Sequence, residues 1–345
     1  MFYFISCQYS GYILELQTMR KKIGNFTKLA KIYRSYQTGR AVCHYLPLRI
    51  WLEPTDRCNL ACPICINRTI PDDQKGDMPW ELFCSIINQL EGEICDINLF
   101  HRGEPLLHPR ISEMISYIKA RKMTTRIHTN ATKLTKQLSN NLLSAGLDYI
   151  SFSFDGFDKE TYERNRVNAV FEETLDNIIN FLKNKKELKA RNCFTVLQII
   201  DTGFSRDQKA KQKFLKNFSG LPLNKISIRT PHNWAGGISV SHQDKPRRPI
   251  VCTFPWYGLT IFRDGKVYPC SQDYGGEIYI GDLNQQSLAD IWNNQILQQI
   301  RKDFYHKNYG SYRPCTKCDR IWRTKLLGVP LEYIGTFIRE AVIRK

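Results

Sequence analysis

The pattern that most constrains the fold is a strand followed by a helical stretch, repeated six times between residues 48 and 230. Residues 111–122 and 171–190 show clear helical periodicity between the strands. Such an alternation predicts a parallel sheet, either open and doubly wound or curled into a partial barrel. The expected strands cover residues 48–54, 96–100, 124–130, 149–155, 193–200 and 225–230.

The two faces of these strands decide between the two architectures. In the fourth strand, isoleucine and phenylalanine alternate with Ser151, Ser153 and Asp155. In the sixth strand, two isoleucines alternate with Ser227 and Arg229. A sheet covered by helices on both sides would be apolar on both faces. We therefore expect a TIM-like partial (β/α)6 barrel whose outer face packs on helices and whose inner face lines a wet lumen.

The sequence changes character after the sixth strand. Residues 233–251 are rich in proline, glycine and charge, which is typical of a linker. Residues 259–270 predict a β-hairpin with an Asp-Gly turn, and residues 287–304 predict a helix with Ser287 as its N-cap. We therefore expect a small C-terminal domain, built from a β-hairpin plus a helix, after the barrel.

Residues 21–36 place apolar side chains at helical spacing with lysines between them. We interpret them as a helix docked on the barrel, in preference to a helix on a membrane surface. The first residues lack the basic stretch and unbroken apolar core of a secretory signal. No run approaches the roughly 18 apolar residues of a membrane span. We expect a cytoplasmic protein without an integral membrane span.

Twelve cysteines in a cytoplasmic chain indicate metal ligands or reactive thiols, because that compartment keeps thiols reduced. Two groups stand out, and the remaining cysteines are isolated, as small buried apolar residues often are. The first group is Cys58, Cys62 and Cys65, and the second group is Cys252, Cys270, Cys315 and Cys318.

The first group follows the carboxyl end of the first strand, where barrel proteins place their chemistry. A zinc site would be closed by four ligands or contain histidine, and no histidine lies near this loop. Three thiolates on a four-iron cluster leave one iron free for an external ligand. The loop therefore predicts a cluster that binds a cofactor.

The spacing of Cys58, Cys62 and Cys65 is CxxxCxxC, which resembles the signature of the radical SAM superfamily. In that family a 4Fe-4S cluster holds the amino and carboxylate groups of S-adenosyl-L-methionine (SAM) on its vacant iron. An electron from the cluster splits SAM into methionine and a 5′-deoxyadenosyl radical. The resemblance implies the same two cofactors here.

Other stretches resemble motifs of this family in the expected order. The segment "HRGEPLLHP", residues 101–109, is similar to a Gly-Gly-Glu-Pro element that holds the methionine amino group. The resemblance assigns this contact to Gly103 and Glu104. Arg102 replaces the first glycine, and we expect that its side chain is able to enter the cavity.

Three further resemblances concern contacts to SAM. "HTNAT" is similar to a Thr-Asn-Gly turn and implies a role for Asn130, with Ala131 in place of glycine. "SFSFDG" nominates Ser153 and Asp155 for the ribose and carboxylate, and Arg166 falls where relatives often carry a SAM-contacting arginine. The alternative is that these are ordinary polar lining of a hydrated barrel and, for the arginine, a surface residue near a helix start.

The second cysteine group would also suit a structural zinc ribbon. However, "IYIGDLNQQSLADIW", residues 278–292, resembles the SPASM/twitch extension of radical SAM enzymes. The resemblance implies an auxiliary iron–sulfur cluster. Four cysteines suffice for one fully ligated auxiliary 4Fe-4S cluster and not for two, as in the shorter twitch form.

The expected organisation has five parts. They are an N-terminal basic helical extension (1–47), a radical SAM core (48–232), a linker (233–251), a SPASM/twitch auxiliary iron–sulfur domain (252–322) and a C-terminal helical tail (323–345).

The reaction depends on the fate of the substrate radical. An electron that leaves through the auxiliary cluster gives net oxidation or a cross-link, whereas a thiol that returns a hydrogen atom gives epimerisation. Cys84, Cys95 and Cys193 are placed away from the carboxyl-end mouth, which favours oxidation. Candidate substrate contacts or bases at strand ends are Arg229, which is best placed, together with Arg102, His128, Gln198 and His232.

We therefore expect a radical SAM oxidoreductase that dehydrogenates a sugar or polyol, including phosphate- or nucleotide-linked forms, in antibiotic or polysaccharide biosynthesis. The alternatives are a peptide- or protein-modifying maturase and a radical sugar epimerase. Relatives that recruit peptides often carry an N-terminal recognition domain, and 47 residues precede the first strand here, which favours the small substrate.

The charge of the chain indicates an acidic partner. Lys and Arg number 50 against 33 Asp and Glu, which gives a net charge of +17. We expect a flavodoxin or ferredoxin to dock on this charge as electron donor. A nucleic-acid-binding protein with structural metal sites would leave the SAM motifs and the polar lumen unexplained, so no nucleic-acid partner is expected.

Overall fold

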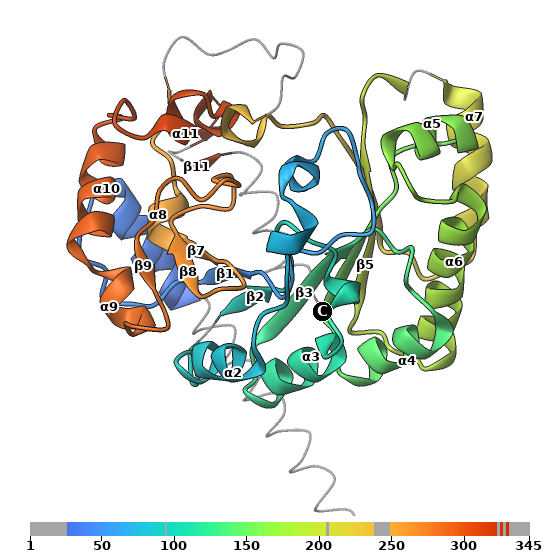
Figure 1. The fold of residues 1–345 in the computed structure, drawn as a ribbon, viewed down its shortest axis with the longest axis horizontal. Coiled ribbons are helices and arrows are strands. Elements are labelled where there is room, and N and C mark those ends of the chain that lie inside the picture. Colours follow the sequence, from blue (N-terminus) through green and yellow to red (C-terminus); the bar gives the residue numbers. More distant parts are fainter. Residues whose placement is uncertain are drawn as a thin grey trace, which may run out of the picture.

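A nine-stranded sheet forms the frame of the molecule (Figure 1). The computed structural model describes residues 26–93, 95–204, 207–237 and 249–322, and the backbone of residues 325–326 and 329–330. The strand order is β6-β5-β4-β3-β2-β1-β7-β8-β9. The strands are β1 (Arg49–Leu52), β2 (Asp96–Asn98), β3 (Thr124–Thr129), β4 (Tyr149–Ser153), β5 (Phe194–Ile200), β6 (Lys225–Arg229), β7 (Gly258–Ile261), β8 (Lys266–Tyr268) and β9 (Gly281–Asp282).

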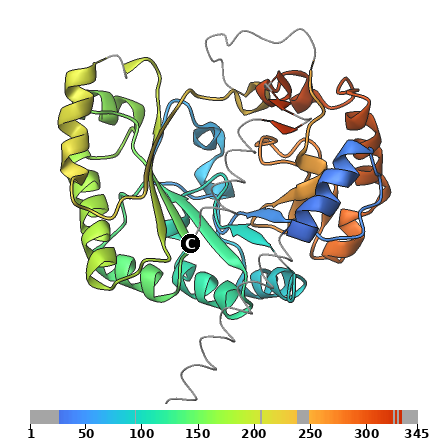
Figure 2. The same cartoon turned by 180° about the vertical axis from the view of Figure 1, so that it is seen from behind.

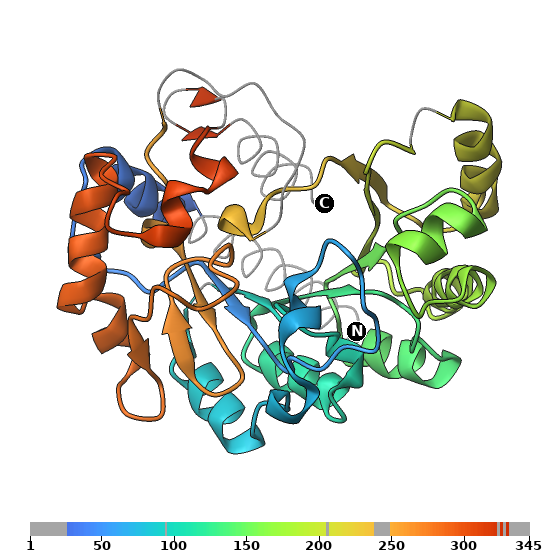
Figure 3. The same cartoon turned by 45° about the horizontal axis from the view of Figure 1, so that its top comes forward.

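Helices cover the outer face of this sheet, and Figure 3 shows that the sheet is curved. Each long helix buries one apolar stripe against the sheet, as α3 does with Ile111, Met114, Ile115 and Ile118. The helices are α2 (Trp80–Asn88), α3 (Ile111–Ala120), α4 (Lys136–Ser144), α5 (Lys159–Asn165), α6 (Phe171–Glu187), α7 (Gln208–Leu215), α8 (Phe254–Tyr257), α9 (Leu288–Trp292), α10 (Gln295–Tyr305) and α11 (Arg313–Thr316).

Strands β1 to β6 all pair in parallel, which confirms the partial (β/α)6 barrel. The register also keeps the two faces apart. Ile127 of β3 pairs with Ile150 of β4, and both are fully buried. The next pair along the strands is His128 with Ser151, on the inner face. The alternation in the sequence therefore separates a helix-covered face from a polar inner face.

The C-terminal hairpin is part of the barrel sheet. Strand β7 pairs in parallel with β1, and β8 and β9 continue the sheet in antiparallel fashion. The hairpin turns at Asp264 and Gly265, where Gly265 adopts a φ of 90° that favours glycine. The hairpin of the predicted small C-terminal domain extends the edge of the sheet at β1 (Figure 1).

The single helix expected over residues 287–304 is two helices, α9 and α10. Ser287 is the N-cap of α9, since its hydroxyl accepts a hydrogen bond from the Asp290 N–H. Helix α9 ends at Trp292, and Asn294 begins helix α10 as its N-cap. The Asn294 side chain accepts a hydrogen bond from the Leu297 N–H at 2.8 Å. Asn293 bonds instead to the backbone of Cys43, 250 residues earlier in the chain.

Residues 26–37 form the described part of the N-terminal helix, which lies beside α8 (Figure 2). The ring of Tyr36 packs edge-on against Trp256, with ring centroids 5.7 Å apart. The Tyr36 hydroxyl also donates to the Val251 carbonyl. This helix therefore docks next to α8 and β7, on the part of the sheet that the C-terminal region contributes. The residues that precede it in the predicted extension lie outside the described residues.

The predicted helical tail is wrong where the structure describes it. Residues 325–326 and 329–330 pair as the short antiparallel strands β10 (Lys325–Leu326) and β11 (Val329–Pro330). The intervening glycine and the proline of "LLGVP" explain this, because both residues are poor helix formers. The rest of the predicted tail lies outside the described residues. None of the described helices is long and apolar enough to span a bilayer.

Candidate iron–sulfur and SAM site

The first three cysteines occupy the loop that follows β1, at the carboxyl end of the sheet. Cys62 is buried and Cys58 and Cys65 are half-buried. The loop is held from two sides, because Asn67 Nδ2 donates to the Asp56 carbonyl at 2.7 Å and the Ala61 N–H donates to the Val167 carbonyl at 3.1 Å. All the cysteines that the structure describes are free thiols.

Each of these three sulfurs faces one polar side chain that comes from another element. Asn130 Nδ2 lies 4.0 Å from Cys58 Sγ, and Arg166 Nη1 lies 3.9 Å from Cys62 Sγ. The Tyr274 hydroxyl lies 3.4 Å from Cys65 Sγ. Because hydrogen bonds to coordinating sulfur tune iron–sulfur clusters, these three contacts suit thiolate ligands.

The protein alone favours protonated thiols at Cys58 and Cys62. Burial, together with the nearby Glu104, raises the pKa of Cys58 to about 12. Burial also raises the pKa of Cys62, although Arg166 opposes this. A bound metal deprotonates a coordinating thiol. The loop is therefore suited to hold sulfur ligands for a cationic group, and it does not maintain thiolates by itself.

Glu104 is a buried carboxylate next to this loop. Its oxygens accept hydrogen bonds from Thr129 Oγ1 at 2.7 Å, the Asn130 N–H at 2.7 Å and the Leu106 N–H at 3.1 Å. Burial nevertheless raises its pKa to about 7. Gly103 lets the chain pass close to the cysteine loop, because a Cβ there would collide with the Thr55 carbonyl oxygen. The structure thus brings Gly103 and Glu104 beside the cysteines.

The turn after β3 holds Asn130 in one orientation. Asn130 Nδ2 donates to Asn59 Oδ1 at 3.1 Å, and its Oδ1 accepts from the Thr132 N–H and hydroxyl. Ala131 adopts a φ of 61°, in the left-handed region that favours glycine. The turn therefore keeps the geometry of a Thr-Asn-Gly turn although the third residue is alanine.

Asp155 and Arg166 form a buried ion pair that reaches the cysteine loop. Arg166 Nη2 lies 2.6 Å from Asp155 Oδ2, and Asp155 Oδ1 accepts from the Ile200 N–H at 2.7 Å. Burial raises the pKa of Asp155, and the guanidinium opposes this rise. Ser153 lies half-buried at the end of β4. Both Asp155 oxygens are thus engaged within the protein, and Arg166 links them to Cys62.

Arg102 points to the C-terminal hairpin. Its Nε and Nη2 form a two-pronged ion pair with Glu53, at 2.8 and 2.7 Å. Its guanidinium lies 3.7 Å from the ring centre of Phe262, a hairpin residue. Burial tends to raise the pKa of Glu53, but Arg102 and His101 lower it to about 2. The structure therefore places Arg102 at the junction between barrel and hairpin.

Two of the other predicted substrate contacts lie on the inner face of the barrel. Arg229 is exposed at the end of β6, and its Nε donates to Ser227 Oγ at 3.1 Å. His128 stacks on Phe100 with ring centroids 4.0 Å apart. Burial, with Arg229 and other arginines nearby, lowers the pKa of His128 to about 3, so this ring is neutral.

Gln198 and His232 complete the predicted substrate contacts. Gln198 pairs with Ser227 in the register of β5 and β6, and thus shares the inner face. Burial lowers the pKa of His232 to about 3, and its ring packs edge-on against Trp234 with centroids 4.2 Å apart. Both residues lie toward the carboxyl ends of the last strands.

The second cysteine group lines one cavity in the C-terminal domain, together with apolar residues such as Pro255 and Ile278. Its four thiols are those of Cys252, Cys270, Cys315 and Cys318. Burial raises the pKa of Cys252 to about 12 and that of Cys318 to about 11, and it also raises the pKa of Cys270 and Cys315. Four sulfurs around an apolar cavity suit a buried iron–sulfur cluster, whose iron deprotonates them.

The described residues contain no set of three His, Cys, Asp or Glu side chains that converges tightly enough to hold a single metal ion.

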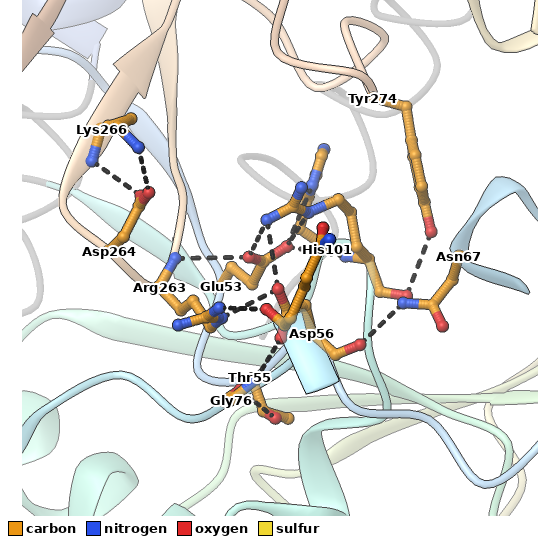
Figure 4. Close-up of polar contacts among 12 residues, drawn as sticks. Glu53, Thr55, Asp56, Asn67, Gly76, His101, Arg263, Asp264, Lys266 and Tyr274 are labelled. Carbon is orange, nitrogen blue, oxygen red and sulfur yellow. Dashed lines mark hydrogen bonds and ion pairs between the residues drawn. The ribbon is translucent and has the colours of Figure 1, made fainter. Parts of the chain in front are cut away.

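Sequence reasoning missed two residues of this site, Glu53 and Tyr274. Tyr274 is buried, and its hydroxyl donates to the Arg102 carbonyl at 3.1 Å besides contacting Cys65. Glu53 binds both Arg102 and the Arg263 N–H (Figure 4). In the sequence, the position of Tyr274 four residues after Cys270 was the one sign that it lies near a proposed cluster site. A lone glutamate at a strand end carries no such signal.

Comparisons with known proteins agree with this geometry. Residues 52–197 match the model of the Radical SAM superfamily, and residues 252–319 match the model of an iron–sulfur cluster-binding domain, SPASM. Taken together, the two models imply iron–sulfur clusters and SAM binding.

Two curated relatives and one solved structure are similar over most of their length. The tungsten-containing aldehyde ferredoxin oxidoreductase cofactor-modifying protein of Pyrococcus furiosus is 26% identical, over 78% of this chain and 86% of the relative. The PqqA peptide cyclase of Granulibacter bethesdensis is 24% identical, over 79% of this chain and 80% of the relative. The crystal structure of BtrN in complex with AdoMet and 2-DOIA superposes with a TM-score of 0.56 and 19% identity, over 79% of this chain and 93% of that chain. The chain thus belongs to the radical SAM superfamily and carries a C-terminal SPASM iron–sulfur cluster-binding domain.

Proposed function

We propose that the chain is a radical SAM oxidoreductase with two 4Fe-4S clusters. One cluster binds Cys58, Cys62 and Cys65, and the auxiliary cluster binds the four cysteines of the C-terminal cavity. The observation that carries this proposal is the difference in ligand number and setting between the two sites. Three ligands leave one iron for SAM, whereas four leave none, so the second cluster is suited to accept an electron.

In this proposal the protein binds and orients SAM with groups around the first loop. Held by Cys58, Cys62 and Cys65, the cluster would supply the electron that splits SAM into methionine and a 5′-deoxyadenosyl radical, and that radical would take a hydrogen atom from the substrate. Glu104 accepts the methionine amino group as a carboxylate held by three hydrogen bonds. Asn130, Ser153 and the Asp155–Arg166 pair fix the loop and the neighbouring wall of the pocket.

The substrate that we propose is a sugar or other polyol carrying an anionic group, of the kind used in antibiotic or polysaccharide biosynthesis. The inner face carries hydroxyl and amide side chains at Ser227 and Gln198, which suit polyol hydroxyls. Arg229 is exposed beside them and suits a phosphate or carboxylate. His128 is neutral and half-buried, so we propose it as a wall of the pocket near the substrate.

We propose oxidation because the described lone thiols lie away from the mouth of the barrel. Cys95 and Cys193 directly precede β2 and β5, and Cys84 lies within α2. A thiol at the carboxyl ends would be needed to return a hydrogen atom to the substrate. Among the described residues, the cysteines at those ends all belong to the two proposed cluster sites.

A peptide-modifying activity is the second candidate, because PqqA peptide cyclases cover most of this chain in sequence. One experiment separates the candidates. The anaerobically reconstituted protein is incubated with SAM, reductant and either deuterated polyols or candidate peptides. Deuterium in 5′-deoxyadenosine identifies the substrate class, and solvent deuterium at the same carbon of the product would show epimerisation.

Iron counting tests the cluster assignment before any substrate is known. About eight irons and eight sulfides per chain are expected if both sites hold 4Fe-4S clusters. About four irons with one zinc would contradict the auxiliary cluster. Should the loaded protein fail to cleave SAM under strong reductant, the whole proposal would be wrong.

The electron donor in this proposal is an acidic flavodoxin or ferredoxin. The net charge of +17 supports such docking, because complementary charge accelerates association at low salt. Reduction of the clusters by a flavodoxin is therefore expected to slow as ionic strength rises from low to physiological. A rate that does not change over this range would exclude electrostatic docking.

A further inference from the structure

Tyr274 connects the two proposed cluster sites. It belongs to the turn that begins at the auxiliary ligand Cys270, and its hydroxyl lies 3.4 Å from Cys65 Sγ in the core loop. The other two core sulfurs face side chains of the barrel itself, from Asn130 and Arg166. Of these three contacts, only the one to Cys65 therefore comes from the auxiliary domain.

The turn that carries Tyr274 is held by several hydrogen bonds and a ring contact. The Gln272 N–H donates to Cys270 Sγ at 3.2 Å, and the Asp273 carboxylate accepts from the backbone of Glu277 and Ile278. The ring of Tyr274 stacks on His101 with centroids 5.3 Å apart. A displacement at Cys270 is consequently transmitted to the Tyr274 ring instead of being absorbed by the turn.

The hydroxyl of Tyr274 has a single hydrogen and two acceptors. It lies 3.1 Å from the Arg102 carbonyl and within contact distance of Cys65 Sγ. A cluster-bound sulfur carries no hydrogen, so a bond between the two must be donated by the tyrosine. Hydrogen bonds to charged acceptors are stronger than those to neutral ones, so the more negative, reduced cluster draws the hydroxyl away from the carbonyl.

We propose that Tyr274 is a positioning residue through which the auxiliary domain sets the reduction potential of the SAM-binding cluster. The inference rests on the proposed function, since it requires that Cys65 ligates that cluster. The bond is stronger in the reduced state, and it therefore raises the potential. Removal of the hydroxyl makes the cluster harder to reduce.

The test is an EPR-monitored redox titration of the reconstituted full chain. SAM perturbs only the signal of the cluster with a vacant iron, which distinguishes the two clusters. For Tyr274→Phe we expect about a tenfold loss in the equilibrium constant for reduction of that cluster, which for a one-electron couple is a shift of about 59 mV to lower potential. The auxiliary cluster should keep its potential.

Tyr279→Phe is the matched control, because Tyr279 lies five residues further along and is 48% exposed. It should leave both potentials unchanged. An unchanged SAM-cluster potential in Tyr274→Phe, with about eight irons retained, would overturn the inference and leave the proposed function intact. Absence of a SAM-sensitive signal in the unmodified protein would instead overturn the proposed function.

A double-mutant cycle with Cys270→Ser tests the path through the turn. Loss of this ligand should lower the SAM-cluster potential in the unmodified background and cause a smaller change in Tyr274→Phe. The direct electrostatic effect of the lost auxiliary cluster is the same in both backgrounds and cancels. Fully additive shifts would contradict the path. If Tyr274→Phe does not load iron, an unchanged SAM-cluster potential in Cys270→Ser alone also overturns the inference.

Discussion

The core loop and the C-terminal cavity present their sulfurs in different surroundings. In the core loop, each sulfur faces a polar side chain brought in from a distant element. In the cavity, Cys270 and Cys318 accept hydrogen bonds from backbone N–H groups two residues further along their own loops, at Gln272 and Arg320. The core site therefore depends on the assembled fold, whereas the cavity builds much of its polar environment from local turns.

This difference suits the two proposed roles. A site that binds SAM and starts chemistry needs several elements to meet at one point, so that bound groups are oriented. A site that only stores or passes an electron needs burial and complete ligation. Substitutions at the two sites should therefore have separable effects.

The largest expected effect is that of Cys62→Ala. It removes one of three ligands from a cluster that has none to spare, so SAM cleavage should fall to the background rate. Iron content should drop from about eight to about four per chain. Cys84→Ala, in α2 and outside both sites, should retain iron and activity. Unchanged SAM cleavage in the Cys62 variant would contradict the proposal that Cys62 ligates the cluster of the core loop.

The next effect is that of Cys315→Ala in the cavity. The auxiliary cluster should be lost and product formation should fall to background, because its electron acceptor is missing. Reductive cleavage of SAM without substrate should continue, because the core ligands are untouched. Equal loss of both activities would show that the two sites do not act separately.

A smaller effect concerns pH and Glu104. Its pKa of about 7 means that the carboxylate needed for an ammonium group is lost below neutral pH. SAM affinity should therefore fall about tenfold per pH unit below 7. In Glu104→Gln the affinity should be weak and nearly independent of pH, as measured by equilibrium binding of labelled SAM. Glu113→Gln, an exposed control on α3, should behave as the unmodified protein.

The raised pKa of Glu104 has the opposite effect on the stability of the SAM-free protein, which should fall as the pH rises. Because the folded pKa of Glu104 lies above its ordinary value of 4.5, its stabilising contribution is complete below that value and is lost as pH rises through about 7. SAM should therefore raise the unfolding temperature more at pH 8 than at pH 6. The reverse order would contradict the assignment of Glu104 to the amino group.

The smallest effect on chemistry, with a clear effect on stability, is expected at the junction between the two regions. Glu53→Gln removes the carboxylate that binds the half-buried Arg102 and leaves Asp56, at 3.5 Å, as its remaining acidic partner, which should destabilise the protein by about 1.5–3 kcal/mol. Glu172→Gln, from an exposed pair with Lys159, should cause no measurable change. The free energy of unfolding of both variants is measured by anaerobic urea unfolding.

The pH dependence of this pair follows from the lowered pKa of Glu53. The contribution is present above the ordinary value of 4.5 and is lost as pH falls toward about 2. Unfolding midpoints of the unmodified protein and Glu53→Gln should therefore converge in strong acid. A constant difference at all pH values would show that the charge of Glu53 is not responsible.

The sequence predicted the barrel and both cysteine sets because each has a short-range signature. The alternation of Ser151 and Ser153 with apolar residues reports one inner face, and CxxxCxxC is read within eight residues. The break at Asn293 and Asn294 was missed because Asn293 pairs with a segment 250 residues away. Such pairing leaves no mark on local periodicity, which is the property that sequence reasoning detects.

The contacts at the junction were missed for the same physical reason. Glu53 and Arg102 are single charged residues whose meaning lies in their mutual contact, 49 positions apart. Arg102 was expected at the cavity because it stands in a SAM motif, and the structure engages it with Glu53 and Phe262. Tyr274 contacts Cys65 across 209 positions. Contacts of this range arise from topology and not from residue spacing.

The parallel pairing of β7 with β1 has a consequence for engineering. The C-terminal iron–sulfur region supplies a strand to the barrel wall, so the two regions are not interchangeable modules joined by a tether. A protein shortened after β6 would expose β1 as a bare apolar edge, ready to pair with other chains. Chimeras between relatives should therefore be joined within the loops that flank the whole sheet, and not at the boundary between its barrel strands and its hairpin.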